Sequence, residues 1–293
     1  MTYIFLCVQY PKRWVFQFGY WFITGVMLVF ATAHMSTTAR ADEMDLTLQA
    51  DLQRIAQQKI FFGHQSVGRN LLEGIEQLSA KAGVSVRVIE VPTAGSLGQA
   101  GIGHTAVAKN GDPFQKLKSF EQALGQQATG PDIALVKFCY VDFTPNVDTK
   151  ALFESYRTTI NTLQAKNPST IFVHVTAPLT VIQGGFKGTI KRLLGKAPYG
   201  FKENVRREEY NARLRQAYLG REPIFDLARI ESTDQNGNTV TSEWQGIEAP
   251  AMAPAYTDDG GHLNSTGKLR AARELISVLA RIPGRRSTGT QSR

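Results

Sequence analysis

The chain has 293 residues, enough for one large domain or two small ones. Only one of its two cysteines, Cys139, lies beyond the first 41 residues, which excludes a fold held together by disulfides. The formal net charge is +8, but arginines gather in the C-terminal tail, so the charge does not indicate a nucleic-acid-binding protein.

The first 41 residues have the order of a secretory signal peptide. Lys12 and Arg13 precede an apolar run from Trp14 to Ala33, and the small-x-small triplet Ala39-Arg40-Ala41 follows it. This order predicts cleavage after Ala41. An uncleaved anchor is the alternative, because a run of about 20 apolar residues can span a bilayer. We expect an exported protein, periplasmic or extracellular, without membrane contact after cleavage.

The rest of the chain is predicted to be a single domain, residues 42–282, followed by a disordered basic tail, 283–293. No internal repeat or low-complexity linker divides it. The sequence leaves the oligomeric state open.

Within this domain, helices and strands alternate. Helical periodicity predicts helices over 45–59, 67–82, 114–127, 149–166, 205–219 and 265–282. Apolar and β-branched runs predict strands over 60–62, 84–91, 132–138, 170–175 and 223–227. A Gly-rich loop (92–113), a basic insertion (183–202) and a polar loop (231–261) lie between them. The alternation predicts a three-layer α/β/α sandwich around a central parallel sheet.

Ligands of open parallel sheets bind beyond the carboxyl ends of the strands. The predicted strands bring several polar segments to that edge: 63–66, the Gly-rich loop, 139–142, 174–178 and the loop that ends at His262. The functional site is expected there.

Two of these segments can supply a serine nucleophile and its base. Ser66 stands at a junction between a strand and a helix, and Asp259 precedes His262 by three residues in a Gly-containing turn. A serine hydroxyl needs a base to take its proton, and the base needs a carboxylate to orient it. The alternative is a polar loop in which His262 and Asn264 only cap the last helix.

The segment Asp259-Gly-Gly-His262-Leu-Asn, followed by Gly267 and an Ala-rich helix, resembles the last block of the SGNH (GDSL-like) hydrolases. Gly63-His-Gln-Ser66 stands where that family has its first block. The resemblance implies a flavodoxin-like SGNH hydrolase fold and a triad in which Ser66 attacks, His262 is the general base and Asp259 orients His262. It implies no cofactor.

The sequence departs from the family pattern in two blocks. His64 and Gln65 separate Gly63 from Ser66, where the family has Gly-Asp-Ser. In the third block, Val141 occupies the position of the Asn that donates to the oxyanion. One donor of the oxyanion hole must therefore come from elsewhere if the protein is an enzyme.

The resemblance implies two further oxyanion donors, the backbone N–H of Ser66 and that of a glycine in the Gly-rich loop. Gly103 is our choice for the glycine, with Gly111 as its rival. The candidates to replace the missing Asn are Tyr140, Lys137 and Asn110.

Other polar residues could have either a functional or a structural role. His64, Lys137 and Asp142 are candidates for substrate binding, although His64 could equally make a structural hydrogen bond and Asp142 could brace a turn. The histidines lack the spacing of a zinc motif, so we expect no metal. The lysines of the basic insertion could bind an anionic glycan or form a solvated surface.

Taken together, the sequence predicts an exported serine esterase that acts on a small acyl ester, such as an O-acetylated carbohydrate. Two alternatives remain. The same triad could transfer the acyl group to a sugar hydroxyl, or the fold could serve a non-catalytic glycan-binding protein, which Val141 favours.

Overall fold

A computed structural model describes residues 45–126 and 130–284. The predicted signal segment and nearly all of the predicted tail lie outside the described residues. The chain divides into two compact units, Met1–Thr47 and Leu48–Arg293, and the sheet, its helices and the site all belong to the second. Within the described residues, we find no helix with the length and hydrophobicity to cross a membrane.

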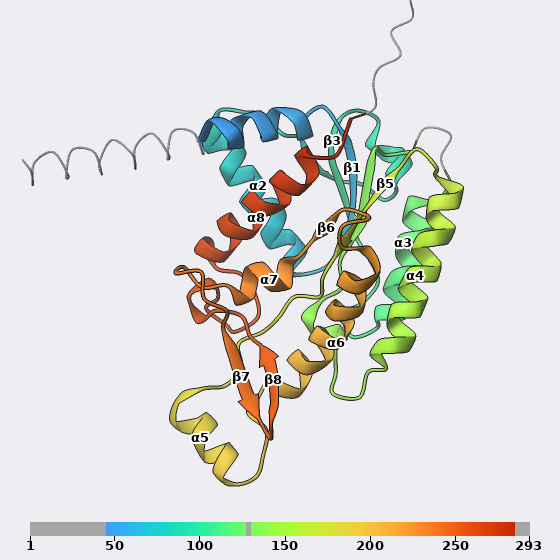
Figure 1. The fold of residues 1–293 in the computed structure, drawn as a ribbon. Helices are drawn as coiled ribbons and strands as arrows, with labels where there is room; N and C mark the ends of the chain where they lie inside the picture. The colour runs from blue at the N-terminus through green and yellow to red at the C-terminus, as the bar shows by residue number, and fades with distance from the viewer. Residues whose placement is uncertain (1–44, 127–129, 285–293) are drawn as a thin grey trace, which may run out of the picture. The chain divides into compact units, whose positions relative to one another are not determined.

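Six parallel strands form the central sheet, in the order β2-β3-β1-β4-β5-β6 (Figure 1). They are β1 Lys59–His64, β2 Val88–Glu90, β3 Gly101–Ala106, β4 Ile133–Val136, β5 Ile171–Val175 and β6 Ile224–Phe225. Without the edge strand β2, this is the strand order of a flavodoxin-like sheet. The predicted α/β fold with a central parallel sheet is confirmed.

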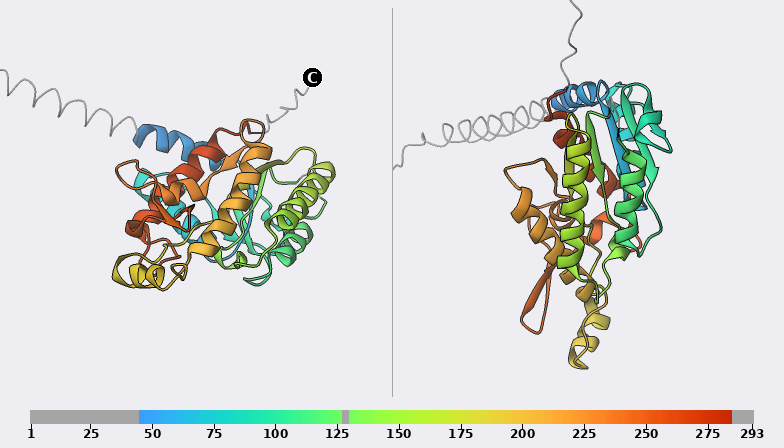
Figure 2. Two further views of the ribbon diagram at one scale, coloured as in Figure 1. Left: turned by 60° about the horizontal axis from the view of Figure 1, so that its bottom comes forward. Right: turned by 90° about the vertical axis from the view of Figure 1, so that its right-hand side faces the viewer.

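Helices cover both faces of this sheet (Figures 1 and 2). One face carries α2 Val67–Ala82, α7 Leu227–Ser232 and α8 Ser265–Ala280, and the other carries α3 Pro113–Leu124, α4 Thr149–Lys166 and α6 Phe201–Tyr218. Side chains alternate across a strand, so Phe62 packs in the first layer and Phe61 in the second. The three predicted layers are therefore present, with one apolar core on each face of the sheet.

The sequence prediction was wrong in the segments that it treated as loops. The Gly-rich segment contains a short 3-10 helix, Ala94–Leu97, and the strand β3. The polar segment contains the last two residues of α7 and a hairpin of β7 Thr241–Trp244 and β8 Ile247–Pro250, and the basic insertion contains α5 Gly185–Leu193. Glycine is depleted in strands, so the sequence GIGHTA of β3 does not look like one.

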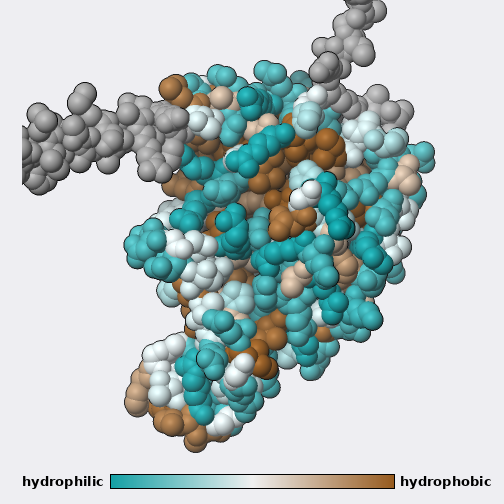
Figure 3. Space-filling model, viewed as in Figure 1, coloured by the Kyte–Doolittle hydropathy of each residue, from teal (hydrophilic) through white to brown (hydrophobic). Residues whose placement is uncertain are grey.

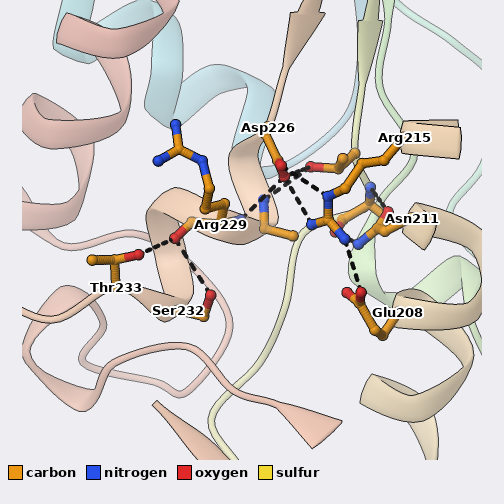
Figure 4. A network of polar contacts seen from close by, with 10 residues as sticks. Glu208, Asn211, Arg215, Asp226, Arg229, Ser232 and Thr233 are labelled. Atoms are coloured by element: carbon orange, nitrogen blue, oxygen red, sulfur yellow. Dashed lines mark hydrogen bonds and ion pairs between the residues drawn. The ribbon is translucent and has the colours of Figure 1, made fainter. Parts of the chain in front are cut away.

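A polar network fastens α6 to the carboxyl end of β6 (Figure 4). The Arg215 guanidinium donates to both carboxylate oxygens of Asp226, at 2.8 and 2.9 Å, and to Glu208 at 2.8 Å. Asp226 also caps the N-terminus of α7 by accepting from the Arg229 N–H. This network fixes the position of α6, which carries Arg207 to the site described below.

Candidate active site

Ser66 lies in a strained turn between β1 and α2. Its φ of 47° and ψ of −106° fall in a region that residues other than glycine rarely adopt. Two backbone hydrogen bonds close the turn, from Gly68 N to Gln65 O (3.0 Å) and from Arg69 N to Ser66 O (2.8 Å). Such strain persists where the surrounding structure imposes it, and strained residues of this kind cluster at functional sites.

The side chains of Ser66, His262 and Asp259 form a chain of short contacts. Ser66 Oγ lies 2.6 Å from His262 Nε2, and His262 Nδ1 lies 2.6 Å from Asp259 Oδ2. The structure thus brings together the three residues that the sequence predicted as a triad. Asn264 also caps α8, since its side chain accepts from Gly267 N.

Backbone groups hold the Asp259 carboxylate in its ionised form. Its Oδ1 accepts hydrogen bonds from the N–H groups of His262 (2.8 Å) and Gly261 (2.9 Å), and Thr257 Oγ1 lies 3.2 Å away. These N–H donors, followed by the His262 ring, lower the pKa of Asp259 far below its ordinary value. At neutral pH the carboxylate is therefore charged and fixed beside the imidazole.

The packing of α2 against α8 brings Ser66 and His262 together from distant parts of the chain. A Cβ at Gly74 would lie 2.6 Å from Lys268 O and 2.7 Å from Ala272 Cβ, so the two helices approach closely only because this residue is glycine. Asn70 Oδ1 accepts from Leu263 N at 3.2 Å and ties α2 to the residue after His262. The distance between nucleophile and base is thus set by helix packing.

Tyr140 lies against the imidazole from the other side. Its hydroxyl is 3.5 Å from His262 Nε2, and its ring leaves no room for a side chain at Gly261. Arg207 donates two hydrogen bonds to the Tyr140 carbonyl, at 3.1 and 2.8 Å. Burial raises the pKa of Tyr140, with smaller contributions from Cys139 and Asp259, so the phenol stays protonated at neutral pH. It can therefore donate a hydrogen bond.

Among the other predicted oxyanion donors, the assignment of Gly103 is wrong. It lies inside β3, paired with Phe61 in the middle of the sheet, and its missing Cβ makes room for Leu97 and Val91. The loop on which its assignment rested does not exist at that position.

The rival glycine and Asn110 follow β3, nearer the carboxyl edge. The Gly111 N–H already donates to Asp142, and the exposed Asn110 accepts from Lys116 Nζ through its Oδ1. Gly111 is therefore engaged in a structural hydrogen bond, whereas the Asn110 side chain stays accessible to solvent.

The three candidates for substrate binding, His64, Lys137 and Asp142, are buried, which contradicts that prediction. At most 5% of each residue is exposed, and each side chain has an internal partner. Lys137 Nζ donates to Phe138 O, and Lys116 Nζ donates to both oxygens of Asp142 at 2.9 and 2.6 Å. Burial also lowers the pKa of Lys137 to about 8, and its 0% exposure rules it out as a donor to the oxyanion. These side chains therefore support the site from inside the protein.

The residues between Gly63 and Ser66, which depart from the family pattern, have structural roles. His64 is the last residue of β1, and its Nε2 lies 3.2 Å from His104 Nδ1. Gln65 Nε2 donates to Ala108 O at 2.6 Å and so fastens the turn to the loop after β3. Gly63 lies within β1, where its missing Cβ accommodates the Phe120 ring. The sharp turn lies at Ser66 itself.

Other residues that shape the site were missed by the sequence reasoning. Arg207, Asn70 and Thr257 act through hydrogen bonds to partners that local patterns do not identify. Gly68 is required because a Cβ there would lie 2.4 Å from the His64 side chain. Its place two residues after Ser66 is the one local signal that could have found it.

A groove of about 630 Å³ opens beside Asp259 and Gly261. Tyr140, Val141, Thr180, Glu203 and Arg207 are among the residues that line it. Val141, at the position where the family has its oxyanion Asn, is 41% exposed and offers no side-chain donor. Among residues 45–126 and 130–284, no cluster of three or more His, Cys, Asp or Glu side chains could hold a metal ion.

No family model matches the sequence, and no curated protein matches it. Solved structures do match. One is a protein named as an acylhydrolase from Bacteroides fragilis, at 16% identity over 75% of this chain and 85% of that one, with a TM-score of 0.45. Another is a GDSL-like lipase from Bacteroides thetaiotaomicron, at 12% identity over 75% and 86%, with a TM-score of 0.44.

An acetyl xylan esterase also matches, at 14% identity over 74% of this chain and 97% of that one, with a TM-score of 0.44. The solved structures that this chain resembles thus include GDSL-like proteins.

Proposed function

We propose that this protein is a serine esterase with Ser66 as its nucleophile. The observation that carries the proposal is the pair of 2.6 Å contacts that link Ser66 Oγ to His262 and His262 to Asp259 at the carboxyl edge of the sheet. A hydroxyl, a base and an ionised carboxylate in this order can transfer a proton away from the serine during attack.

In the proposed reaction, Ser66 Oγ attacks the acyl carbon of an ester while His262 Nε2 takes its proton. Asp259 stabilises the imidazolium and keeps Nδ1 protonated. His262 then gives the proton to the departing alcohol, which leaves an acyl group on Ser66. A water molecule attacks that acyl group with His262 again as base, which releases the acid and restores the serine.

The tetrahedral intermediate of each step carries a negative charge that needs donors. We assign the Ser66 N–H at the N-terminus of α2, where the helix dipole favours an anion, together with the Tyr140 hydroxyl. Tyr140 is supported by its contact with His262 Nε2 and by its raised pKa. Tyr140→Phe should then lower kcat by roughly a hundredfold while KM changes little, and an unchanged kcat would remove Tyr140 from this role.

The proposed substrate is a small acyl ester of a carbohydrate, which the protein would meet after export. The groove supports this proposal because polar side chains that suit hydroxyl groups, such as Thr180, Gln183 and Glu203, line it next to the triad. Export is supported by the basic, apolar and small-residue order of the first 41 residues.

Hydrolysis fits the site better than acyl transfer or simple binding. The side chains of His262 and Asp259 are 44% and 57% exposed, so water reaches the position where it would attack an acyl enzyme. A binding protein would have no use for a serine held at a φ of 47° against a histidine.

Hydrolysis of p-nitrophenyl acetate tests the proposal. Ser66→Ala should lose nearly all activity, whereas Ser85→Ala, which changes an exposed serine in the loop between α2 and β2, should keep the wild-type rate. If Ser66→Ala were as active as the wild type, the assignment of the nucleophile would be wrong.

A further inference from the structure

The basic insertion, residues 183–202, projects apolar side chains into solvent. We refer to it as the α5 segment. Phe186 and Leu193 are each 81% exposed, Leu194 is 67% exposed and Tyr199 is 74% exposed. Figure 3 shows apolar residues beside hydrophilic ones at the lower end of this face, where Figure 1 places α5. So large a share of apolar surface in 20 residues indicates an interaction surface.

The helix α5 carries its apolar side chains on the face that points away from the protein. Gly188 is the buried residue of this helix. At 3.6 residues per turn, Phe186, Ile190 and Leu193 lie on the opposite side from Gly188. An ordinary surface helix has the reverse orientation, with its apolar stripe toward the core. The orientation here presents that stripe to a partner.

Basic side chains flank the apolar stripe. The segment contains Lys187, Lys191, Arg192, Lys196 and Lys202 and has no Asp or Glu. An apolar stripe between cationic side chains is typical of helices that lie in the interface of a membrane, where lysine and arginine bind anionic headgroups. The positive charge of the segment therefore favours an anionic surface as its partner.

Buried side chains and hydrogen bonds hold the segment to the rest of the fold at both of its ends. Ile182, just before the segment, and Phe201, near its end, are buried in a small core with Ala249 and Ala251. The Gln183 N–H donates to Tyr199 O at 3.0 Å and closes its base. Arg192 also donates to Ser242 Oγ on β7 at 2.9 Å.

We propose that the α5 segment is a membrane-contact surface that inserts Phe186, Leu193 and Leu194 into the headgroup region of an anionic bilayer. This proposal departs from the expectation that the exported protein makes no membrane contact after cleavage of its signal segment.

The same contact would bring the groove beside the triad to the bilayer. Gln183, Tyr199 and Gly200, at the base of the segment, line that groove together with Asp259 and Gly261. An ester displayed at the bilayer surface could then reach Ser66 without leaving the surface. This consequence rests on the proposed function, whereas the membrane contact does not.

An environment-sensitive fluorophore on α5 tests the contact. In the full-length Cys7→Ser chain, where the remaining Cys139 is buried, Thr189→Cys places the label next to the apolar stripe. Thr158→Cys, an exposed position of α4, is the matched control. Because the label reports its own surroundings, attachment through the first 41 residues does not produce the signal.

With vesicles that contain phosphatidylglycerol, the label at position 189 should shift to the blue and be quenched by nitroxides on the acyl chains, while the label at position 158 should not respond. Phe186→Ser with Leu193→Ser should weaken this response about tenfold or more. Lys187→Gln with Lys191→Gln should weaken it as well.

A label at position 189 that ignores the vesicles, or responds equally to pure phosphatidylcholine, would overturn the proposal. The same measurement in Ser66→Ala should match the wild type. Failure of the membrane contact and failure of the esterase assignment are thus separate outcomes.

Discussion

The buried ion pair of Lys116 and Asp142 should be essential to the stability of the site. Both side chains are 0% exposed, and Asp142 also accepts from Cys139 N at 2.6 Å and Gly111 N at 2.8 Å. The carboxylate thus joins α3 and the loop after β3 to the segment that carries Tyr140. Asp142→Asn removes the charge and leaves the Lys116 ammonium in the core without its counter-ion.

Breaking such a pair costs about 3–5 kcal/mol, because the remaining charge stays desolvated and uncompensated. We therefore expect Asp142→Asn to lower the free energy of unfolding by roughly that amount in urea denaturation. The matched control is the exposed pair of Lys166 and Glu121, whose atoms lie 3.0 Å apart. Glu121→Gln should cost about 1 kcal/mol or less.

A double-mutant cycle completes this test. Lys116→Met with Asp142→Asn removes both charges, so the double variant should lose much less stability than the sum of the two single variants. A cost of Asp142→Asn as small as that of Glu121→Gln, or additive costs in the cycle, would refute the reasoning.

Three further predictions follow from the site and the core. Asp259→Asn should lower kcat toward p-nitrophenyl acetate by roughly 10⁴-fold, because an amide cannot hold the imidazole in the required tautomer; a loss below tenfold would count against the triad. Ser66→Gly should be more stable than Ser66→Ala by about 1 kcal/mol in urea unfolding, because glycine adopts the φ of 47° without strain; equal stability would mean that the turn is unstrained. Burial raises the pKa of Glu231 to about 8 from its ordinary 4.5. The folded chain therefore keeps a proton that the unfolded chain loses, and between pH 5 and 8 the wild type should lose stability relative to Glu231→Gln, by on the order of a few kcal/mol. A pH-independent difference between the two proteins would contradict this.

Sequence patterns predicted the parts of the fold that depend on local periodicity. The bounds of α2 and α4 match the predicted helices, because each carries apolar residues at helical spacing, and α4 begins after Asp148, whose side chain caps it. The triad residues were found from short motifs, since Asp259 and His262 lie in one turn and Ser66 lies at a strand–helix junction. That they act in catalysis stays a prediction.

Local sequence patterns could not predict the contacts between distant segments. Strand β3 was missed because Gly101 and Gly103 leave no alternation to recognise, while their missing Cβ atoms make room for Arg87, Val91 and Leu97. The full burial of Lys137 and Asp142 could not be predicted from the sequence, because charged residues are seldom fully buried. The partner that permits the burial of Asp142, Lys116, lies 26 residues away on α3.

The orientation of α5 could not be predicted from the sequence either. Lysines alternate with apolar residues in the basic insertion, which suits a solvated surface or an anion-binding one. Which side of the helix faces the protein depends on how the segment is held at Ile182 and Phe201, and the sequence does not specify that.

The central claim is that Ser66 is an activated nucleophile. Its most direct test is reaction of the folded protein with a fluorophosphonate, followed by mass spectrometry of the modified peptide. We predict a single adduct on Ser66 that is lost in His262→Ala, which removes the base but leaves the serine. Absence of an adduct on Ser66, or equal labelling of His262→Ala, would contradict the account.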